Sequence, residues 1–363
     1  MIIAINAAPF IQPGSGNYLQ DYFLNYAAAH PTQELVFIGD YPSTITAAEN
    51  VVFIHSKPAA NNSLLWKYWL NYTLPAIARR QKASLLIHLG NAVSLRTRLP
   101  QWMVVDDLSY IAFPNFYPRQ LASLLKKNGR AFINKAVKII ALSDFLSSEI
   151  QQKFQVPSYK IQPLVILPTA TFQSIGWEQK ELTREKYASG KEYFLFCGAL
   201  HGRNNLINLL KAFTFFKTRQ KSNMQLVICT ENVPGGNSFV RELATYKFRR
   251  EVILLTDLPE VEKATVMGAA YAFVYPSTYD GTGILALQAM QCGIPVITGN
   301  NGVFGLAEPG LVLTVDPTNY QDIAYKMMVL FKEEDQRNEL IGAGRLYLQQ
   351  LRSGDATRLV MEG

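Results

Sequence analysis

Cysteine is scarce in this sequence of 363 residues, which has three cysteines and no CxxC pair. Cys197, Cys229 and Cys292 lie far apart, each among apolar residues. A disulfide framework or a cysteine-rich zinc site needs more numerous or more closely spaced cysteines. The sequence therefore predicts three buried free thiols in a reducing compartment.

The sequence also lacks an apolar run long enough to cross a bilayer, which takes about 20 residues. Its first ten residues, MIIAINAAPF, have no basic segment ahead of the apolar one, and so predict a first strand rather than a signal peptide. We accordingly expect a cytoplasmic protein. With 48% hydrophobic residues, the chain can fill the cores of two domains of ordinary size.

Acidic residues are few in the first half of the chain. Residues 1–175 contain 15 Lys and Arg against 8 Asp and Glu, whereas residues 176–363 contain 20 of each, so the whole excess of +7 lies in the first half. This excess predicts either a solvated basic surface or one that contacts anionic lipid headgroups or an acidic acceptor. Nucleic acid is not expected, because aromatic and basic residues do not interleave. Most of the cations are Arg79, Arg80, Lys82, Arg96, Arg98, Lys126, Lys127, Arg130, Lys135 and Lys138.

Strand and helix patterns alternate along both halves, which favours an α/β fold with parallel, doubly wound sheets. A polar stretch, 168–190, predicts a linker between them. In the first half, strands are expected at 2–6, 35–39, 85–88, 103–105, 137–142 and 161–167, and helices at 18–29, 64–81, 121–134 and from the cap Ser143 to about 154. In the second half, strands are expected at 193–197, 225–230, 252–255, 272–275 and 295–298, and helices at 206–218, 239–246, 261–267, 284–291, 319–330 and 335–351.

Two Rossmann-like domains follow from this alternation, at 1–172 and 190–345, and a C-terminal helix within 346–363 is expected to pack back toward the first domain. The two domains are expected to face a cleft, because ligands bind such folds at the carboxyl ends of the strands.

The segment from Tyr275 to Asn300, YPSTYDGTGILALQAMQCGIPVITGN, is the most informative part of the sequence. A strand ends before Pro276, a glycine turn at 280–283 opens a helix, and Gly293 ends that helix before the next strand, which makes a βαβ unit. Amides at a helix start behind two glycines bind anions readily, so the segment predicts a phosphate-bearing ligand. It also carries two polar residues eight positions apart, Asp280 and Gln288.

This segment resembles the donor-site signature of retaining glycosyltransferases with the GT-B fold, family 4 (glycosyl transferases group 1). In that signature an acidic residue precedes a glycine-rich turn and a second one follows eight positions later. Other segments resemble the same family in the same order along nearly the whole chain. They are Gly14-Ser15-Gly16, residues 105–110 with Phe113-Pro114, residues 139–143 and residues 196–206.

The sequence departs from the family pattern at four positions, so its donor-site motif is altered. Asn204 stands where the family usually has a Lys that contacts the donor diphosphate, and Gln288 stands where it usually has a second Glu. Asp106 replaces a frequent His, and Asp280 replaces the usual first Glu with a side chain one methylene shorter.

The resemblance implies roles for residues of the second domain. Arg203 and the segment Gly281, Thr282, Gly283 and Ile284 would bind the donor diphosphate, together with Asn204. Asp280 would orient sugar hydroxyls and stabilise positive charge at the anomeric carbon, Gln288 would bind the ribose, and Leu255 and Leu258 would bind the base through their backbones. The plainer alternatives are a surface Arg203, a tight turn without a ligand, and an Asp280 that only caps a helix.

In the first domain, Gly14 and Gly16 would let the backbone approach the donor or acceptor, and Asp106 and Asp107 would lie at the catalytic centre. The Gly14-x-Gly16 spacing with Asp40 also imitates a dinucleotide fingerprint, but the third glycine is missing, and the glycines lie too far from the strand. His201, in the Arg203 loop, is a candidate phosphate contact, and His88 is expected to pack at a strand end.

Three functions are compatible with these residues. The first is a retaining glycosyltransferase that moves a sugar from a nucleotide-sugar to a cell-surface glycan or glycolipid, without a metal or other cofactor, in the cytoplasm or on the inner face of the membrane. The second is a catalytically weakened GT-B protein that serves as the partner or scaffold of an active transferase. The third is a sugar-nucleotide epimerase on the same fold. The sequence leaves open the donor base, the sugar, the acceptor and the oligomeric state.

Overall fold

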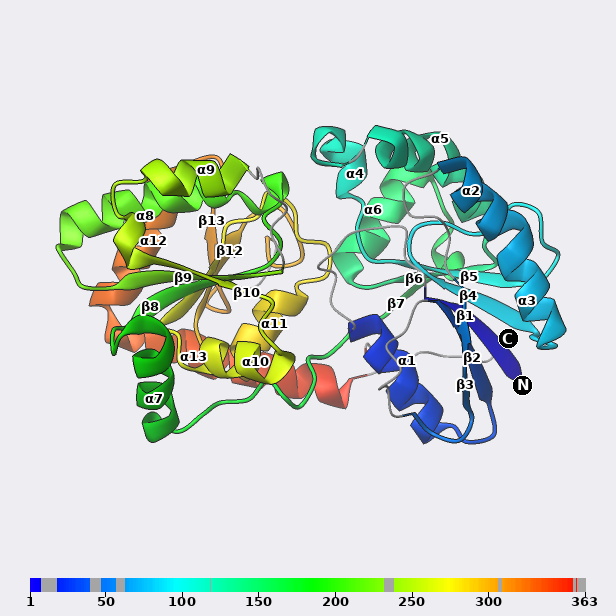
Figure 1. Ribbon diagram of the computed structural model, residues 1–363, viewed down its shortest axis with the longest axis horizontal. Helices are drawn as coiled ribbons and strands as arrows, with labels where there is room; N and C mark the ends of the chain where they lie inside the picture. Colours follow the sequence, from blue (N-terminus) through cyan, green and yellow to red (C-terminus); the bar gives the residue numbers. More distant parts are fainter. Residues whose placement is uncertain are drawn as a thin grey trace. The chain divides into compact units, whose positions relative to one another are not determined.

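The structure is a computed structural model that describes residues 1–7, 18–39, 47–56, 63–117, 119–231, 238–305, 309–354 and 357, with the side chains of Ser63, Gln120, Leu121 and Ser238 left out. The chain divides into two compact units, Met1–Ile166 and Leu167–Thr357. Each unit is built on one parallel sheet (Figure 1).

The sheet of the first unit has seven strands in the order β3-β2-β1-β4-β5-β6-β7. Every neighbouring pair is parallel. The order reverses direction at β1, so right-handed crossovers place helices on both faces. The strands are β1 (Ile2–Asn6), β2 (Glu34–Gly39), β3 (Val51–His55), β4 (Leu85–Leu89), β5 (Gln101–Val105), β6 (Lys138–Ala141) and β7 (Ile161–Pro163).

Helix α1 (Tyr18–Ala29) covers one face of this sheet, and the other helices cover the opposite face (Figure 1). Ser143 caps α6 as predicted, because its Oγ accepts a hydrogen bond of 3.1 Å from the amide of Leu146. The helices of the second face are α2 (Ser63–Tyr68), the π-helical segment Trp69–Thr73, α3 (Leu74–Arg80), the short α4 (Ser109–Ala112), α5 (Arg119–Lys135) and α6 (Asp144–Phe154).

The sheet of the second unit has six parallel strands in the order β10-β9-β8-β11-β12-β13. Helices α8, α9 and α12 lie on one face, and α10, α11 and α13 on the other (Figure 1). The strands are β8 (Tyr193–Cys197), β9 (Gln225–Thr230), β10 (Val252–Thr256), β11 (Ala272–Tyr275), β12 (Val296–Gly299) and β13 (Leu313–Val315). The helices are α7 (Trp177–Ala188), α8 (Leu206–Gln220), α9 (Ser238–Thr245), α10 (Glu260–Gly268), α11 (Ile284–Gln291), α12 (Tyr320–Lys332) and α13 (Glu334–Ser353).

These two parallel sheets confirm the predicted α/β architecture with two Rossmann-like domains. The structure differs at the predicted linker, where α7 occupies Trp177–Ala188. That helix buries only Thr183 and Ala188, so it lacks the apolar stripe from which a helix is recognised in a sequence. Strands β3 and β13 were also missed. All three cysteines are buried free thiols, as predicted.

Candidate functional site

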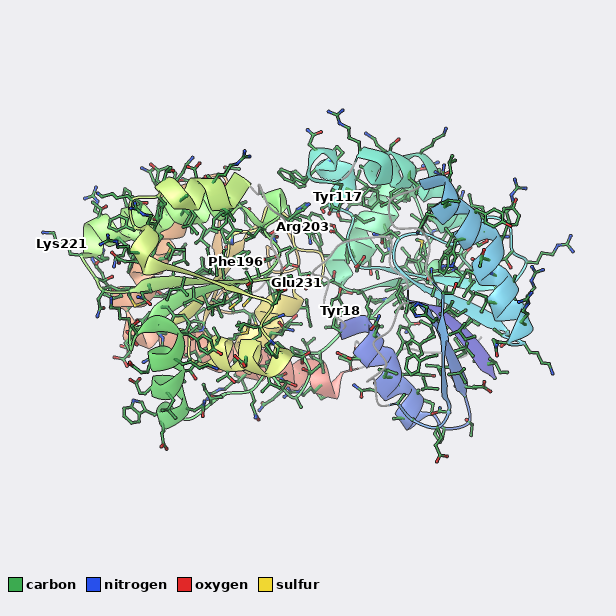
Figure 2. All side chains as sticks on the ribbon, in the orientation of Figure 1. Tyr18, Tyr117, Phe196, Arg203, Lys221 and Glu231 are labelled. Atoms are coloured by element: carbon green, nitrogen blue, oxygen red, sulfur yellow. The ribbon has the colours of Figure 1, made fainter. Side chains whose placement is uncertain are left out.

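The residues expected to bind a donor gather at the carboxyl ends of the strands of the second unit. Arg203 and Asn204 follow β8, and Asp280 follows its neighbour β11. Leu255 lies in the edge strand β10, and Leu258 lies just beyond it. Figure 2 shows Arg203 at the same end of this unit as Glu231, the first residue after β9. The sequence thus placed these residues on the correct edge of the sheet.

The loops after β8 and β11 are joined at the main chain of Arg203. Its carbonyl oxygen accepts hydrogen bonds from the amide of Thr278, at 2.8 Å, and from the hydroxyl of Thr278, at 3.1 Å. The hydroxyl of Ser277 lies 3.2 Å from the same oxygen. Sequence reasoning missed both hydroxyl residues, although they stand between the strand and Asp280. The position of Arg203 is therefore fixed by the loop that carries the acidic residue.

Asn204 is buried, and its side chain forms hydrogen bonds to two different segments of the second unit. Its Nδ2 donates to the carbonyl oxygen of Ala199, at 2.8 Å, and its Oδ1 accepts from the hydroxyl of Tyr275, at 3.0 Å. The side chain thus fastens the loop after β8 to the end of β11. Asn204 stands where the family usually has a phosphate-binding Lys, but in this structure its side chain bonds to the protein itself.

Asp280 precedes α11, whose N-cap is Gly283 without a side-chain capping bond, so the plainer alternative of a helix cap does not hold for it. Its Oδ1 accepts a hydrogen bond of 2.9 Å from the amide of Gly283. Its main chain pairs with the loop after β12, since its amide donates to Asn301 and its carbonyl oxygen accepts from Val303. These contacts hold the carboxylate at the helix N-terminus, where the helix dipole favours a negative charge.

Glycines allow the loops around Asp280 to pack against each other. Gly283 has a φ of 69°, and a Cβ there would lie 2.6 Å from the ring of Phe304. A Cβ on Gly302 would lie 2.4 Å from the carbonyl oxygen of Asp280, so the two main chains approach too closely for any side chain. The repeated spacing of Gly299, Gly302 and Gly305 is the sequence pattern that could have revealed this packing.

Gln288 lies on α11, one turn beyond Ile284, and is partly exposed. Its Oε1 is buried and has no hydrogen-bond partner among the described residues. A buried oxygen without a donor costs about 1–3 kcal/mol, so a ligand hydroxyl that reached it would be stabilised. Of the amides expected to bind phosphate, that of Gly283 is bonded to Asp280, and that of Ile284 lies 3.5 Å from the hydroxyl of Thr282.

In the first unit, Asp107 is buried at the end of β5 and has a structural partner for each oxygen. Its Oδ1 accepts from the amide of Ser109, at 2.6 Å, and its Oδ2 accepts from the hydroxyl of Tyr117, at 2.8 Å. Asp106 precedes it and is partly exposed. Burial, followed by the charges of Asp107 and Asp106, raises the pKa of the Tyr110 hydroxyl. Gly14, Gly16 and Asp40 lie outside the described residues.

The two histidines named in the sequence have structural partners. His88 is fully buried, and its Nε2 donates to Oε1 of Gln101, at 2.9 Å, while its Nδ1 accepts from Nδ2 of Asn6, at 3.1 Å. Burial lowers the pKa of His88 to about 4, so the ring is neutral at physiological pH. His201 lies with its Nδ1 3.4 Å from the amide of Arg203.

Comparison with known proteins finds similar proteins that are named as enzymes of sugar transfer. Residues 179–347 match the family described as Glycosyl transferases group 1. O-antigen chain mannosyltransferase B of Escherichia coli is 24% identical over 247 residues, which cover 67% of this chain and 64% of that protein. Alpha-1,3/1,6-mannosyltransferase ALG2 of Saccharomyces cerevisiae is 24% identical over 232 residues, which cover 53% of this chain and 46% of that protein. The chain thus spans less than two thirds of these two relatives.

Among solved structures, a sucrose-phosphate synthase from Thermosynechococcus elongatus superimposes with a TM-score of 0.77 at 17% identity, covering 96% of this chain and 94% of that one. WaaG, a glycosyltransferase involved in lipopolysaccharide biosynthesis, superimposes with a TM-score of 0.74 at 15% identity, covering 98% and 96%. These likenesses confirm the GT-B fold. The family match lies within the second unit, and the mannosyltransferase relatives are matched over part of their length, so the enzyme activity is taken up as a proposal below and membership of family 4 stays a prediction.

Proposed function

We propose that this protein is a retaining glycosyltransferase that moves a sugar, mannose, from a nucleotide-sugar to a cell-surface glycan or glycolipid. The observation that carries the proposal is the joined pair of loops after β8 and β11, which brings Arg203 and Asp280 to one edge of the sheet. Both residues lie inside the segment that matches the glycosyl transferases group 1 family. Mannose is proposed because several similar proteins are named mannosyltransferases.

The donor diphosphate would be bound chiefly by Arg203. A guanidinium can make two parallel, charge-assisted hydrogen bonds to phosphate oxygens, and here its main chain is already fixed by Thr278. The side chain of Asn204 is engaged with Ala199 and Tyr275, so its share in binding would come from holding the loop. The proposed site therefore relies on one cation where the family usually has two.

The ribose and the base of the donor would extend away from the diphosphate bound at Arg203. The buried Oε1 of Gln288 would accept a hydrogen bond from a ribose hydroxyl, which would satisfy an oxygen that has no partner among the described residues. The backbones of Leu255 and Leu258, at the end of edge strand β10, would lie beside the base.

Asp280 would act on the sugar. In glycosyl transfer the anomeric carbon passes through an oxocarbenium-like state, and a fixed carboxylate stabilises the positive charge that develops there. The hydrogen bond from Gly283 holds Oδ1, so the carboxylate needs little reorganisation during the reaction. In the first unit, Asp106 would face the acceptor side, while Asp107 would support the turn beneath it.

Transfer is proposed to need no metal ion, because no DxD-type pair stands beside a donor strand in the sequence. The acceptor is proposed to be a glycan or a lipid-linked saccharide met at the inner face of a membrane, since the first unit carries the whole excess of positive charge. No helix within the described residues is long and apolar enough to span a bilayer.

The test is an assay of binding, hydrolysis and transfer with UDP-, GDP- and ADP-linked sugars, mannose included. The expected result is transfer from one nucleotide-mannose with retained anomeric configuration. An inactive Arg203→Ala variant that keeps its melting temperature would place the donor at this site. Neither binding nor turnover with any donor would refute the proposal.

A second candidate is favoured by the altered motif. Asn204 and Gln288 stand where the family usually has a Lys and a Glu, so the protein could serve as the partner of an active transferase. Copurification with a second transferase would support that role. The Gln288→Glu variant alone separates the two candidates better than a double variant does, because a Lys at position 204 would enter a buried site. Donor binding by Gln288→Glu together with none by the wild type would favour this candidate.

A further inference from the structure

Arginine side chains from two helices meet at the amino edge of the sheet of the second unit, the edge opposite to the candidate donor site. Arg184, on α7, donates from Nε to the carbonyl oxygen of Ala269, at 3.3 Å. Arg337, on α13, donates from Nε to the carbonyl oxygen of Tyr271, at 3.4 Å. Ala269 and Tyr271 stand just before β11, so both guanidinium groups lie near the start of that strand.

Arg345 reaches the start of the neighbouring strand, β12, from the same helix α13. Its Nη2 lies 3.4 Å from the point where a Cβ on Gly293 would stand, and the hydroxyl oxygen of Ser174 lies at the same distance from that point. Gly293 follows α11 with a φ of 73° and comes shortly before β12. A guanidinium nitrogen and a hydroxyl, both hydrogen-bond donors, therefore lie beside this turn.

Lys180 is a fourth cation at this edge. It lies on α7, one helical turn before Arg184, and is partly exposed. Burial, followed by the positive charges of Arg337, Arg184 and Arg345, lowers the pKa of the Lys180 ammonium. The four cations are thus close enough to repel one another. We call Lys180, Arg184, Arg337 and Arg345 the basic cluster.

The acidic residues at this edge leave most of the basic cluster without a counter-ion. Glu181 and Glu192 both pair with Arg184, at 2.9 and 3.3 Å. Glu334, at the start of α13, forms no ion pair with the cluster, and the other three cations form none with any acid in the part of the chain that the structure describes. An anion placed among these cations would remove their mutual repulsion.

We infer that the basic cluster binds a phosphate group. A phosphate carries about −1.5 to −2 charges at neutral pH, and guanidinium groups bind its oxygens through charge-assisted hydrogen bonds. Arg337 and Arg345 would donate to the phosphate oxygens, and the ammonium of Lys180 would add a third charge. The carbonyl bond to Tyr271 uses only Nε of Arg337, so its other guanidinium nitrogens can turn to a ligand.

Trp177 offers a surface for the remainder of a phosphorylated compound. It is the first residue of α7 and is 77% exposed. It precedes Lys180 by three positions and Arg184 by seven, spacings that place the three side chains on one side of the helix. A sugar or aromatic ring attached to the bound phosphate would pack against the indole. The phosphate therefore comes either from such a compound or from free phosphate.

The basic cluster is separate from the candidate donor site. Arg203 bonds to Thr278, beyond the carboxyl end of β11, whereas the cluster lies before its amino end. The four residues of β11 span roughly 13 Å. A nucleotide-sugar held at Arg203 would thus leave the cluster open, and the inference goes beyond the proposed function.

The test is titration calorimetry of the full chain with inorganic phosphate and with phenyl phosphate, at low and high salt. The wild type is expected to bind at least one of them, more weakly as the salt concentration rises. The Lys180→Gln, Arg345→Gln variant removes two cations that have no ion pair among the described residues, and should bind phosphate about tenfold more weakly or worse. It should melt no lower than the wild type, because it removes like charges that repel.

Three further variants control the measurement. Lys211→Gln, Arg241→Gln removes two exposed cations elsewhere in the second unit and should bind phosphate as the wild type does. Arg203→Ala should also keep this binding, because Arg203 lies at the opposite edge. A preference for phenyl phosphate that Trp177→Leu abolishes would identify an organic phosphate as the ligand, and equal affinities would identify free phosphate.

Four results would overturn the inference. They are no binding of either phosphate, unchanged binding by Lys180→Gln, Arg345→Gln, an equal loss in Lys211→Gln, Arg241→Gln, or a loss in Arg203→Ala alone. The two proposals fail separately, because phosphate binding needs no donor. Phosphate binding without binding of any nucleotide-sugar would refute only the enzyme, and sugar transfer without phosphate binding at the cluster would refute only this inference.

Discussion

Asp107 in the first unit and Asp280 in the second occupy the same kind of place, just after a parallel strand and just before a helix. Both oxygens of Asp107 accept hydrogen bonds from the protein, from Ser109 and Tyr117, and the side chain is buried. Asp280 is partly exposed, and its Oδ1 accepts from Gly283. A carboxylate at the end of a strand can thus complete a turn or face a ligand, and burial separates the two roles.

Among the variants that test this comparison, Asp280→Asn is expected to have the largest effect. The amide oxygen of Asn can still accept a hydrogen bond from Gly283, so the turn survives, whereas the negative charge is lost. We expect kcat to fall about 10³-fold, because a fixed charge beside a developing cation contributes several kcal/mol, while the free energy of unfolding changes by less than about 1 kcal/mol. Steady-state kinetics and urea unfolding measure the two effects.

Asp107→Ala is the matched control and should behave in the opposite way. It leaves the amide of Ser109 and the hydroxyl of Tyr117 without their acceptor, at about 1–3 kcal/mol for each buried group. The free energy of unfolding should fall while kcat of the folded protein stays within about tenfold. Near wild-type transfer by Asp280→Asn would mean that both acids only stabilise the turns in which they stand.

Asn204→Lys tests whether the side chain at position 204 stabilises the fold of the second unit. The substitution breaks the contacts with Ala199 and Tyr275 and places an ammonium in a buried site. We expect the free energy of unfolding to fall by about 3–4 kcal/mol. Thermal denaturation with and without nucleotide measures this, and a variant of unchanged stability would show that the loop can reopen around a cation.

The two units should also respond differently to acid, because the buried His88 belongs to the first. Its folded-state pKa of about 4 lies below the ordinary value of 6.5, so the unfolded chain takes up a proton first as the pH falls. The stability contributed by neutral His88 is complete above pH 6.5 and is lost between pH 6.5 and about 4, by roughly 3 kcal/mol.

NMR titration of the His88 ring, assigned with a His88→Gln variant, tests this expectation. The ring should stay neutral to near pH 4, and urea unfolding across that range should show the loss of stability. A ring that titrates near pH 6.5 would contradict the buried hydrogen bonds to Asn6 and Gln101.

The smallest effect is expected at Gln288. Gln288→Glu should lower the donor KM by about three- to tenfold, since a charge-assisted hydrogen bond to a ribose hydroxyl is stronger than a neutral one. Gln288→Leu should weaken donor binding without loss of stability, because it removes an oxygen that has no partner among the described residues. Equal donor affinities for the wild type, Gln288→Glu and Gln288→Leu would show that Gln288 does not contact the donor.

The sequence predicted the parts of this molecule that depend on local pattern. Apolar strands, glycine turns and the Ser143 cap were visible because each involves residues close together in the chain. The contacts of Asn204 with Tyr275 and of Arg203 with Thr278 join residues more than 70 positions apart, so no local pattern shows them. Helix α7 was missed because it buries too little to leave an apolar stripe.

Titration calorimetry with nucleotide-sugars tests the central claim most directly, that the joined loops of the second unit form the donor site. The wild type is expected to bind one nucleotide-sugar. Arg203→Ala is expected to bind it at least about tenfold more weakly, because a charge-assisted contact to phosphate is lost, while Asp107→Ala binds it as the wild type does. Equal binding by Arg203→Ala, or no binding of any nucleotide-sugar by the wild type, would contradict it.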